Sequence, residues 1–378
     1  RLNNEARSIT CGQPLGDGVV TGHGTFQKFY SQAELRAWID STLEVEAIAA
    51  SPGIFVVFRE EADANEYLIR NRRRRSISVK ISRADRIYDE HRETIDELVE
   101  FFIQRGRLPR RDESIDLQHR LRDAVGGLRR AWNVVRNVTE GTDWEAITAG
   151  RCDDLLVDLA LLKLNRRPNF MALPEATRHD IKEFFGSYKQ ATAEADQLLF
   201  SSGNTELVDE TANAATVGKR LPTALYVHES ALSDLAPVLR VYEGCARWVV
   251  GEIDDANIIK LATNKPKVSY LSDPRFDQAP HPALRETIFV RLWNLDVDWR
   301  SYEDSTNSPI LHRKEQFVAD DYPLRERFAR LTEQEERFGL YDTDLRLIGY
   351  QDGWDEHVSS LGVDIRGHRV VRKPQPDQ

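Results

Sequence analysis

The sequence has few cysteines and no long apolar run. Its three cysteines, Cys11, Cys152 and Cys245, are far apart and odd in number. This usage argues against a disulfide framework and predicts a reducing, cytoplasmic environment. No stretch approaches the roughly 20 apolar residues that a membrane span requires, so we expect no membrane partner.

Metal-binding and catalytic motifs are also missing. No two Cys or His residues have the spacing of C-x-x-C, H-x-x-x-H or H-E-x-x-H, so the sequence predicts no metal site. The glycines at 16, 18, 22 and 24 do not complete a G-x-G-x-x-G motif or a phosphate-binding loop. The chain therefore shows no complete catalytic constellation, and its catalytic residues stay unknown at this stage.

The chain is acidic, with a net charge of −10. A nucleic-acid site on such a body has to be a local basic patch. The densest patch spans 70–92, with nine basic against three acidic residues. Arginine suits phosphate because its planar fork donates two hydrogen bonds and keeps its charge. We predict nucleic-acid contacts from Arg72, Arg73, Arg74, Arg75 and Lys80. The alternative is a solvated connector or a helix face paired to acidic neighbours.

A second basic cluster lies further along the chain. Lys260 and the turn residues 265–267 belong to a predicted hairpin, and three basic residues in a row follow at 312–314. The predicted nucleic-acid contacts of this cluster are Lys265, Lys267, His312, Arg313 and Lys314. Lysines at hairpin tips also serve merely to prevent edge pairing, and that reading stays open.

A weaker reading gives residues 224–318 a hydrolytic activity of their own. Its candidate polar residues are His228, Glu243, Lys265, Lys267, His281 and His312. His312 with Glu315 as a base and its partner is a poor pair, because residues so close in a strand point to opposite sides or lie out of reach. We rank this reading last.

The first segment reads as part of a larger sheet. Ser31 followed by Glu34 has the form of a capping box, so a helix is predicted over 31–43. The apolar run 54–58 after Pro52-Gly53 predicts a strand buried on both faces. A helix and one such strand need a larger sheet to pack on, so we expect the chain to begin within the closing part of an α/β domain.

The pattern then becomes helical and later mixed. Residues 62–215 predict a compact helical bundle, and the polar stretch 205–220 predicts a linker. The remaining segments predict strands at 224–228 and 258–271, alternating strands over 288–299, and helices at 235–250 and 323–338. The predicted fold class is a helix-rich α+β protein with a partial Rossmann-like sheet edge (1–61), a central helical bundle (62–215) and a C-terminal mixed α+β domain (216–378).

Several stretches carry a resemblance that covers nearly the whole chain. They are RLNNEAR at 1–7, GTFQKFY at 24–30, ASPGIFVVFR at 50–59, FGSYK at 185–189, ALYVH at 224–228, RVYEGCAR at 240–247, KPKVSYL at 265–271 and PILHRKE at 309–315. In this order they resemble bacterial methyltransferase-type proteins associated with DNA phosphorothioation, a family of DNA-modification and defence loci.

The resemblance implies a division of labour. In that family a class I, Rossmann-like S-adenosylmethionine domain comes first, and helical and α+β regions follow. Residues 1–59 match only the closing part of that domain. No cofactor-binding residue can therefore be assigned, and none is expected for this chain alone, although S-adenosylmethionine is the expected cofactor of the parent protein.

The resemblance also sets the expected function. The chain would be the C-terminal part of an S-adenosylmethionine-dependent methyltransferase in phosphorothioation-linked DNA modification and restriction, supplying recognition or architectural domains. The alternative is a non-catalytic module of a bacterial defence system that binds nucleic acid or protein. The expected partners are DNA and other proteins of the same locus.

Overall fold

The computed structural model describes residues 12–15, 18–21, 25–28, 30–51, 54–71, 82–253 and 255–373. They form helices and mostly antiparallel sheets, which confirms the predicted α+β class. The chain divides into two compact units. Unit 1 comprises 1–92 with 124–140, and unit 2 comprises 93–123 with 141–378. The helices of 62–215 fall in both units, and the boundaries predicted at 61 and 215 stay predictions.

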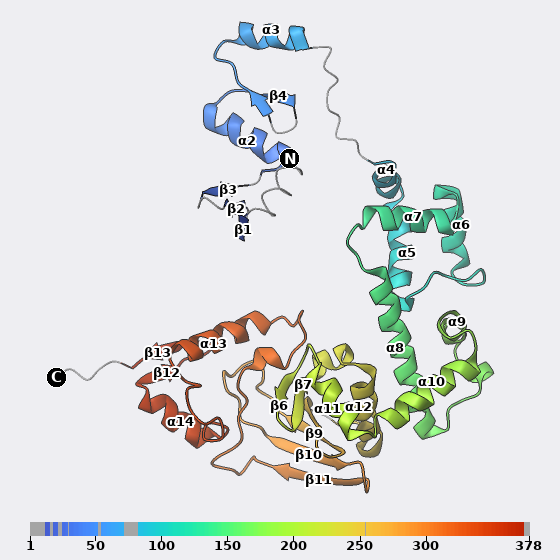
Figure 1. Cartoon of the computed structure of the whole chain (residues 1–378), viewed down its shortest axis with the longest axis vertical. Helices are drawn as coiled ribbons and strands as arrows, with labels where there is room; N and C mark the ends of the chain where they lie inside the picture. The colour runs from blue at the N-terminus through green and yellow to red at the C-terminus, as the bar shows by residue number, and fades with distance from the viewer. Residues whose placement is uncertain are drawn as a thin grey trace, which may run out of the picture. The chain divides into compact units, whose positions relative to one another are not determined.

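Unit 1 contains two small antiparallel sheets and four helices within its described part. Its elements are β1 (Gly12–Leu15), β2 (Gly18–Thr21), β3 (Phe26–Lys28), α2 (Gln32–Leu43), β4 (Ile48–Ser51), β5 (Ile54–Val56), α3 (Glu61–Asn71), α4 (Arg83–Glu90) and α7 (Leu128–Val138). One sheet has the order β1-β2-β3, and β4 pairs with β5 in the other. Figure 1 shows these elements in blue, apart from α7, which is green.

Two predictions for this unit have opposite outcomes. The capping box is confirmed, since Ser31 Oγ accepts from the amide of Glu34 and the Ser31 amide donates to Glu34 Oε2 at 2.8 Å. The strand buried on both faces is wrong. β5 pairs with β4 alone among the described strands, and Ile54 is 57% exposed. A two-stranded hairpin has no inner position at which a strand could be covered on both sides.

Unit 2 begins with a set of helices. Most of α5 (Arg92–Arg105) and of α6 (Ile115–Val125) belong to it, followed by α8 (Trp144–Leu162), η1 (Lys163–Asn165), η2 (Phe170–Ala172), α9 (Glu175–Phe184), α10 (Tyr188–Ser201) and α11 (Thr205–Asn213). α8 packs on α10 and on a later helix, α12, around a core that includes Leu159, Ile181 and Ala195.

The predicted linker over 205–220 is wrong. Asn204 caps α11, because its Oδ1 accepts from the amides of Glu206 and Leu207. Val208 and Ala212 of this helix are buried in the core of the sheet that follows. Spaced by one helical turn, they form a narrow apolar stripe on an otherwise polar helix.

Unit 2 continues with a six-stranded antiparallel sheet whose strands follow chain order. Its strands are β6 (Lys219–Leu221), β7 (Ala224–His228), β8 (Ala256–Ala262), β9 (Lys267–Ser272), β10 (Glu286–Arg291) and β11 (Asp296–Ser301). Between β7 and β8 the chain forms η3 (Glu229–Asp234) and α12 (Pro237–Val250). The predicted strands and the helix near 235–250 are confirmed. Figure 1 shows β9, β10 and β11 following one another, with α11 and α12 beside the sheet.

The two faces of this sheet differ in what covers them. On the first face Val227, Ile259 and Val290 pack against α12, in the largest core of the unit. On the second face Ile258 and Leu271 pack under rings from the segments after β9. Only part of the second face is covered in this way, and the rest carries half-exposed polar side chains.

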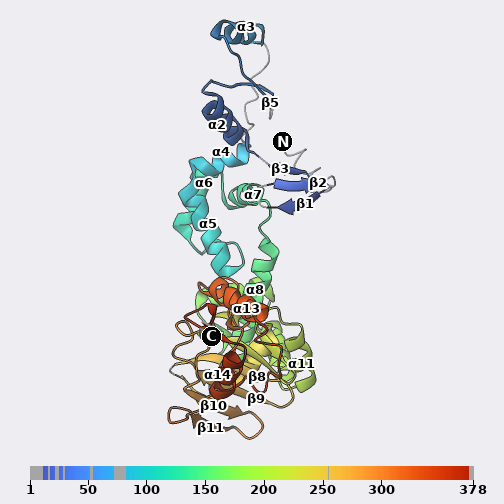
Figure 2. The same ribbon diagram turned by 90° about the vertical axis from the view of Figure 1, so that its left-hand side faces the viewer.

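The C-terminal elements form a smaller layer. They are η4 (Lys314–Gln316), α13 (Arg325–Arg337), α14 (Gln351–Ser360), β12 (Val363–Ile365) and β13 (Val370–Arg372). Figure 2 shows α13 and α14 on the near side of strands β8–β11. Among the described residues, no helix combines the length and the apolar character that crossing a membrane requires.

Two helical glycines differ in the space around them. A Cβ at Gly353 of α14 would approach the carbonyl oxygen of Leu347 closer than non-bonded atoms can, whereas a Cβ at Gly150 of α8 meets nothing within 4 Å. Gly353→Ala should lower the free energy of unfolding by about 1–3 kcal/mol, as overpacking does. Gly150→Ala should raise it by about 0.5–1 kcal/mol, because alanine favours the helix. Denaturant titration of both variants checks the prediction, and equal effects would contradict it.

Candidate nucleic-acid interface

The uncovered part of the second sheet face carries a group of basic side chains, with Asp296 and Asp298 of the edge strand β11 beside them. Antiparallel register places Tyr226 opposite Lys260, Lys260 opposite Ser269, and Ser269 opposite Phe289. Residues directly opposite each other point to the same side of a sheet. We call this surface the basic sheet face and define it by the side chains of Lys219, Tyr226, Lys260, Lys267, Phe289 and Arg291, together with Lys265 in the adjoining turn.

Aromatic rings hold the lysines of this face in place. Lys260 Nζ lies 4.9 Å from the ring centroid of Tyr226, and Lys267 Nζ lies 4.1 Å from that of Phe289. A cation over a ring is stabilised while its head stays in water. Both lysines are half-buried rather than extended into solvent. Their charges are therefore fixed on the sheet surface.

Like charges face each other at the centre of the basic sheet face. Lys267 is directly opposite Arg291 across β9 and β10. Burial lowers the pKa of Lys267, and the nearby charges of Lys265, Lys260 and Arg291 lower it further. Like charges placed directly opposite each other destabilise a sheet. Arg291 has acidic neighbours in Asp298 and Asp296 of β11. Lys267 has no ion pair within the described residues, so the repulsion around it is only partly balanced.

A buried tyrosine holds the turn that carries Lys265. The hydroxyl of Tyr242 on α12 lies 2.9 Å from the carbonyl oxygen of Ala262 and 3.1 Å from that of Lys265. It also accepts a hydrogen bond of 2.7 Å from the amide of Lys267. Burial raises the pKa of Tyr242, so the hydroxyl stays protonated. The turn between β8 and β9 is therefore fixed from the core side, with Lys265 exposed.

Lys219 lies at the other end of the basic sheet face. Its Nζ donates to the carbonyl oxygen of His312 at 3.0 Å and lies 5.4 Å from the ring of Phe317. Burial and the charge of Arg313 lower the pKa of Lys219 to about 8. Lys219 still carries most of its charge at neutral pH.

The structure does not bring the predicted basic residues together on one surface. Lys265 and Lys267 lie together on or beside the basic sheet face. Arg313 pairs with Glu336 at 2.6 Å and lies over the ring of Tyr341, with its side chain partly exposed. The predicted contacts Arg72, Arg73, Arg74, Arg75 and Lys80 lie outside the described residues.

The prediction for His312 and Lys314 is wrong. Lys314 is 3% exposed, and its Nζ donates to the carbonyl oxygens of Phe276 and Ala279. Burial lowers the pKa of Lys314 to about 8. His312 is also buried, with Nε2 2.6 Å from the carbonyl oxygen of Ile348. Both side chains are buried inside the protein, so neither can reach a phosphate.

Of the residues of the hydrolytic reading, His281 and His312 come together, and the others lie apart from them. His281 Nε2 lies 2.5 Å from Glu335 Oε1, inside a buried cluster with His312. His228 stacks on Phe276. Glu243 is on α12, which covers the first sheet face, while the lysines lie on the second. The histidine–glutamate pair links α13 to the preceding loops and serves packing.

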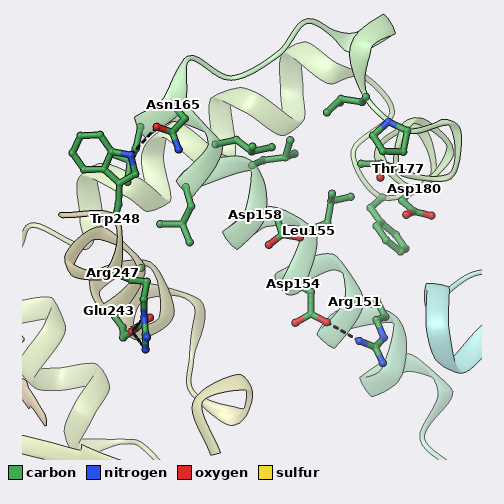
Figure 3. Close-up of a pocket in the computed structure, with 18 of the residues that line it drawn as sticks. Arg151, Asp154, Leu155, Asp158, Asn165, Thr177, Asp180, Glu243, Arg247 and Trp248 are labelled. Atoms are coloured by element: carbon green, nitrogen blue, oxygen red, sulfur yellow. Dashed lines mark hydrogen bonds and ion pairs between the residues drawn. The ribbon is translucent and has the colours of Figure 1, made fainter. Parts of the chain in front are cut away.

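A cavity of about 950 Å³ lies between α8, α9 and α12. Figure 3 shows that six of its polar residues are bonded in pairs: Arg151 to Asp154, Arg247 to Glu243 and Trp248 to Asn165. Its lining contains no histidine or cysteine. Asp158 has no ion pair within the described part, and burial raises the pKa of this carboxyl group against the opposing charge of Arg240.

Lys219, Tyr226, Phe289 and Arg291 were not predicted from the sequence. They lie on three different strands, β6, β7 and β10, and only the register of five strands brings them onto one surface. Alternation within each strand gave the side on which each residue lies, but not which strands are neighbours.

Comparison of the chain with protein families, with curated proteins and with solved structures finds no match. The site therefore has to be interpreted from its own chemistry. It is a fixed group of cations and rings on a sheet face, a surface suited to a polyanion.

The buried histidine cluster predicts acid sensitivity. Burial and the neighbouring His281 lower the pKa of His312 to about 3, against about 6.5 in an unfolded chain. Between these values the unfolded state binds more protons, so stability falls as the pH is lowered. His312→Gln should reduce the loss of unfolding free energy between pH 7 and pH 5 by about 1–2 kcal/mol. Denaturant titrations at both pH values measure this loss. The control is His119→Gln, because His119 is an exposed histidine on α6. An unchanged loss of unfolding free energy in His312→Gln would contradict the assignment.

Proposed function

We propose that unit 2 binds DNA through the basic sheet face. The observation that carries this proposal is the placement of Lys267 opposite Arg291 and beside Lys260 and Lys265. A folded protein retains such repulsion where a ligand of opposite charge relieves it. The spacing of neighbouring strands, about 5 Å, sets the cations at distances comparable to those between successive phosphates.

The contacts of this surface suit the DNA backbone more than base edges. Lysine is a compact charge on a flexible stem and binds phosphate without reading sequence. The rings of Tyr226 and Phe289 are half-buried beneath the lysines. Aromatic rings next to cations are typical of surfaces that bind single strands. The proposed ligand is therefore DNA held by its phosphates, with little dependence on base sequence.

The wider role follows from the sequence resemblance. We propose that the parent protein is an S-adenosylmethionine-dependent methyltransferase of a phosphorothioation-linked modification system, in which this chain supplies DNA recognition. The closing part of a Rossmann-like sheet would then be residues 1–61. The described strands of unit 1 pair only in antiparallel fashion, whereas the cofactor crevice of such folds lies at the carboxyl ends of parallel strands.

The alternative is a module without methyl transfer, in which the same basic sheet face brings DNA to other proteins of a defence locus. It shares the DNA-binding step with the main proposal. The exposed side chains of β11 and its turn, among them Trp293 and Trp299, leave an edge available to such proteins.

Charge removal tests the DNA-binding proposal. The double variant Lys265→Gln/Lys267→Gln should weaken binding of a DNA oligonucleotide about tenfold or more, because two phosphate contacts are lost. The slope of log K against log salt should become shallower by roughly 2. Fluorescence anisotropy at several salt concentrations measures both quantities.

The matched control is Lys182→Gln. Lys182 is also an exposed lysine over a ring in unit 2, with Nζ 5.6 Å from the Phe170 centroid, but it belongs to α9. The DNA affinity and the salt slope of the Lys182→Gln variant should equal those of the unaltered chain. Equal losses in the control and in the double variant would show non-specific charge attraction and contradict the proposal.

A further inference from the structure

A separate polar cluster lies where the loop between α5 and α6 meets α9. Its centre is Arg107, which is 3% exposed. The guanidinium donates to both carboxylate oxygens of Glu113, at 2.6 and 2.8 Å, and through Nε to Asp180 Oδ1 at 2.6 Å. Such bidentate pairs fix geometry as well as adding energy. The loop is thereby held against α9 in one arrangement.

Glu113 is held firmly in this arrangement. Its carboxylate accepts hydrogen bonds from both Nη atoms of Arg107 and, at 2.9 Å, from the amide of Arg110. A fixed carboxylate therefore stands beside the imidazole of His179, with Glu113 Oε1 3.0 Å from His179 Nδ1.

Three side chains next to this carboxylate have the composition of a metal site. Glu175 and His179 are four residues apart on α9, so they share one face of the helix. Asp112 approaches from the loop, with Oδ2 3.3 Å from His179 Nε2. One ligand atom from each of the three lies within 4.8 Å of the other two.

His179 supplies an independent indication. The residue is 7% exposed, and its buried Nδ1 has no aligned hydrogen bond within the described residues. A buried polar atom without a partner costs free energy, so such atoms call for an explanation. A metal ion on Nε2 would fix the proton on Nδ1, and a small rotation of the ring would let that proton reach Glu113. Carboxylate, histidine and metal in this order form a common outer-shell arrangement.

We propose that Asp112, Glu175 and His179 bind a Zn²⁺ ion, with Glu113 orienting the histidine. Ligand atoms at about 2.0–2.2 Å from a tetrahedral ion are separated by roughly 3.4 Å, close to the 3.3 Å between Asp112 and His179. One imidazole with two carboxylates suits zinc better than magnesium, which prefers oxygen ligands alone. The two carboxylates balance the charge of the ion, and a water molecule would complete the fourth position.

This site goes beyond the proposed DNA binding and lies on different elements. No metal site was predicted from the sequence, because the motifs C-x-x-C, H-x-x-x-H and H-E-x-x-H all require two Cys or His residues. The pattern Glu-x-x-x-His on α9 has one, and Asp112 joins it only through the fold. The ion would fasten the loop to α9 from the solvent side, while Arg107 fastens it from within.

Calorimetric titration of the tag-free, chelator-stripped chain with Zn²⁺ tests the proposal. One ion should bind per chain. Asp112→Asn and Glu175→Gln should each weaken binding at least about tenfold, and His179→Gln should weaken it more. The Asp112 side chain is 62% exposed, so its variant should keep its fold, which circular dichroism verifies.

The matched control is Glu183→Gln. Glu183 is an exposed carboxylate on the same helix, 3.8 Å from Arg110. The Glu183→Gln variant should bind Zn²⁺ with the affinity of the unaltered chain. Absence of saturable binding near one ion per chain, or unchanged affinity in both Asp112→Asn and Glu175→Gln, would overturn the proposal.

Discussion

The packing of α12 on one face of the sheet is the constraint on which the rest of unit 2 depends. Leu239, Tyr242 and Ala246 bury the first face together with residues of β7–β10. Because side chains alternate along a strand, burial of Ile259 and Val268 obliges Lys260 and Lys267 to point the other way. A register slip of one residue would bring those charges into the core. The hydrophobic pattern of β8 and β9 therefore determines that Lys260 and Lys267 lie on the second face.

The same helix also holds the turn beside those cations. Tyr242 bonds to the backbone of the β8–β9 turn through its hydroxyl, so one side chain belongs both to the core and to the support of the basic sheet face. A fixed turn presents Lys265 at a lower entropic cost than a mobile one. Two other cations of unit 2, Arg107 and Lys314, are instead buried and bonded inside the protein.

The sequence allowed prediction of those elements whose pattern is local. The β8–β9 hairpin and the cap of α2 depend on neighbouring residues, and both predictions are confirmed. The helix α11 escaped prediction because only Val208 and Ala212 mark its buried stripe. The pattern of one hairpin was enough to predict Lys265 and Lys267 as contacts. Phe289 lies beside Lys267 only because of the order of the strands in the sheet. His312 and Lys314 were misjudged because charge along a sequence does not show burial.

DNA binding at the basic sheet face is measured most directly by lysine acetylation with a water-soluble reagent, read by mass spectrometry with and without bound DNA. We expect DNA to protect Lys260, Lys265 and Lys267 and to leave Lys182 on α9 as reactive as before. Unchanged reactivity of Lys265 and Lys267 at saturating DNA would contradict the assignment of the basic sheet face as the DNA-binding surface.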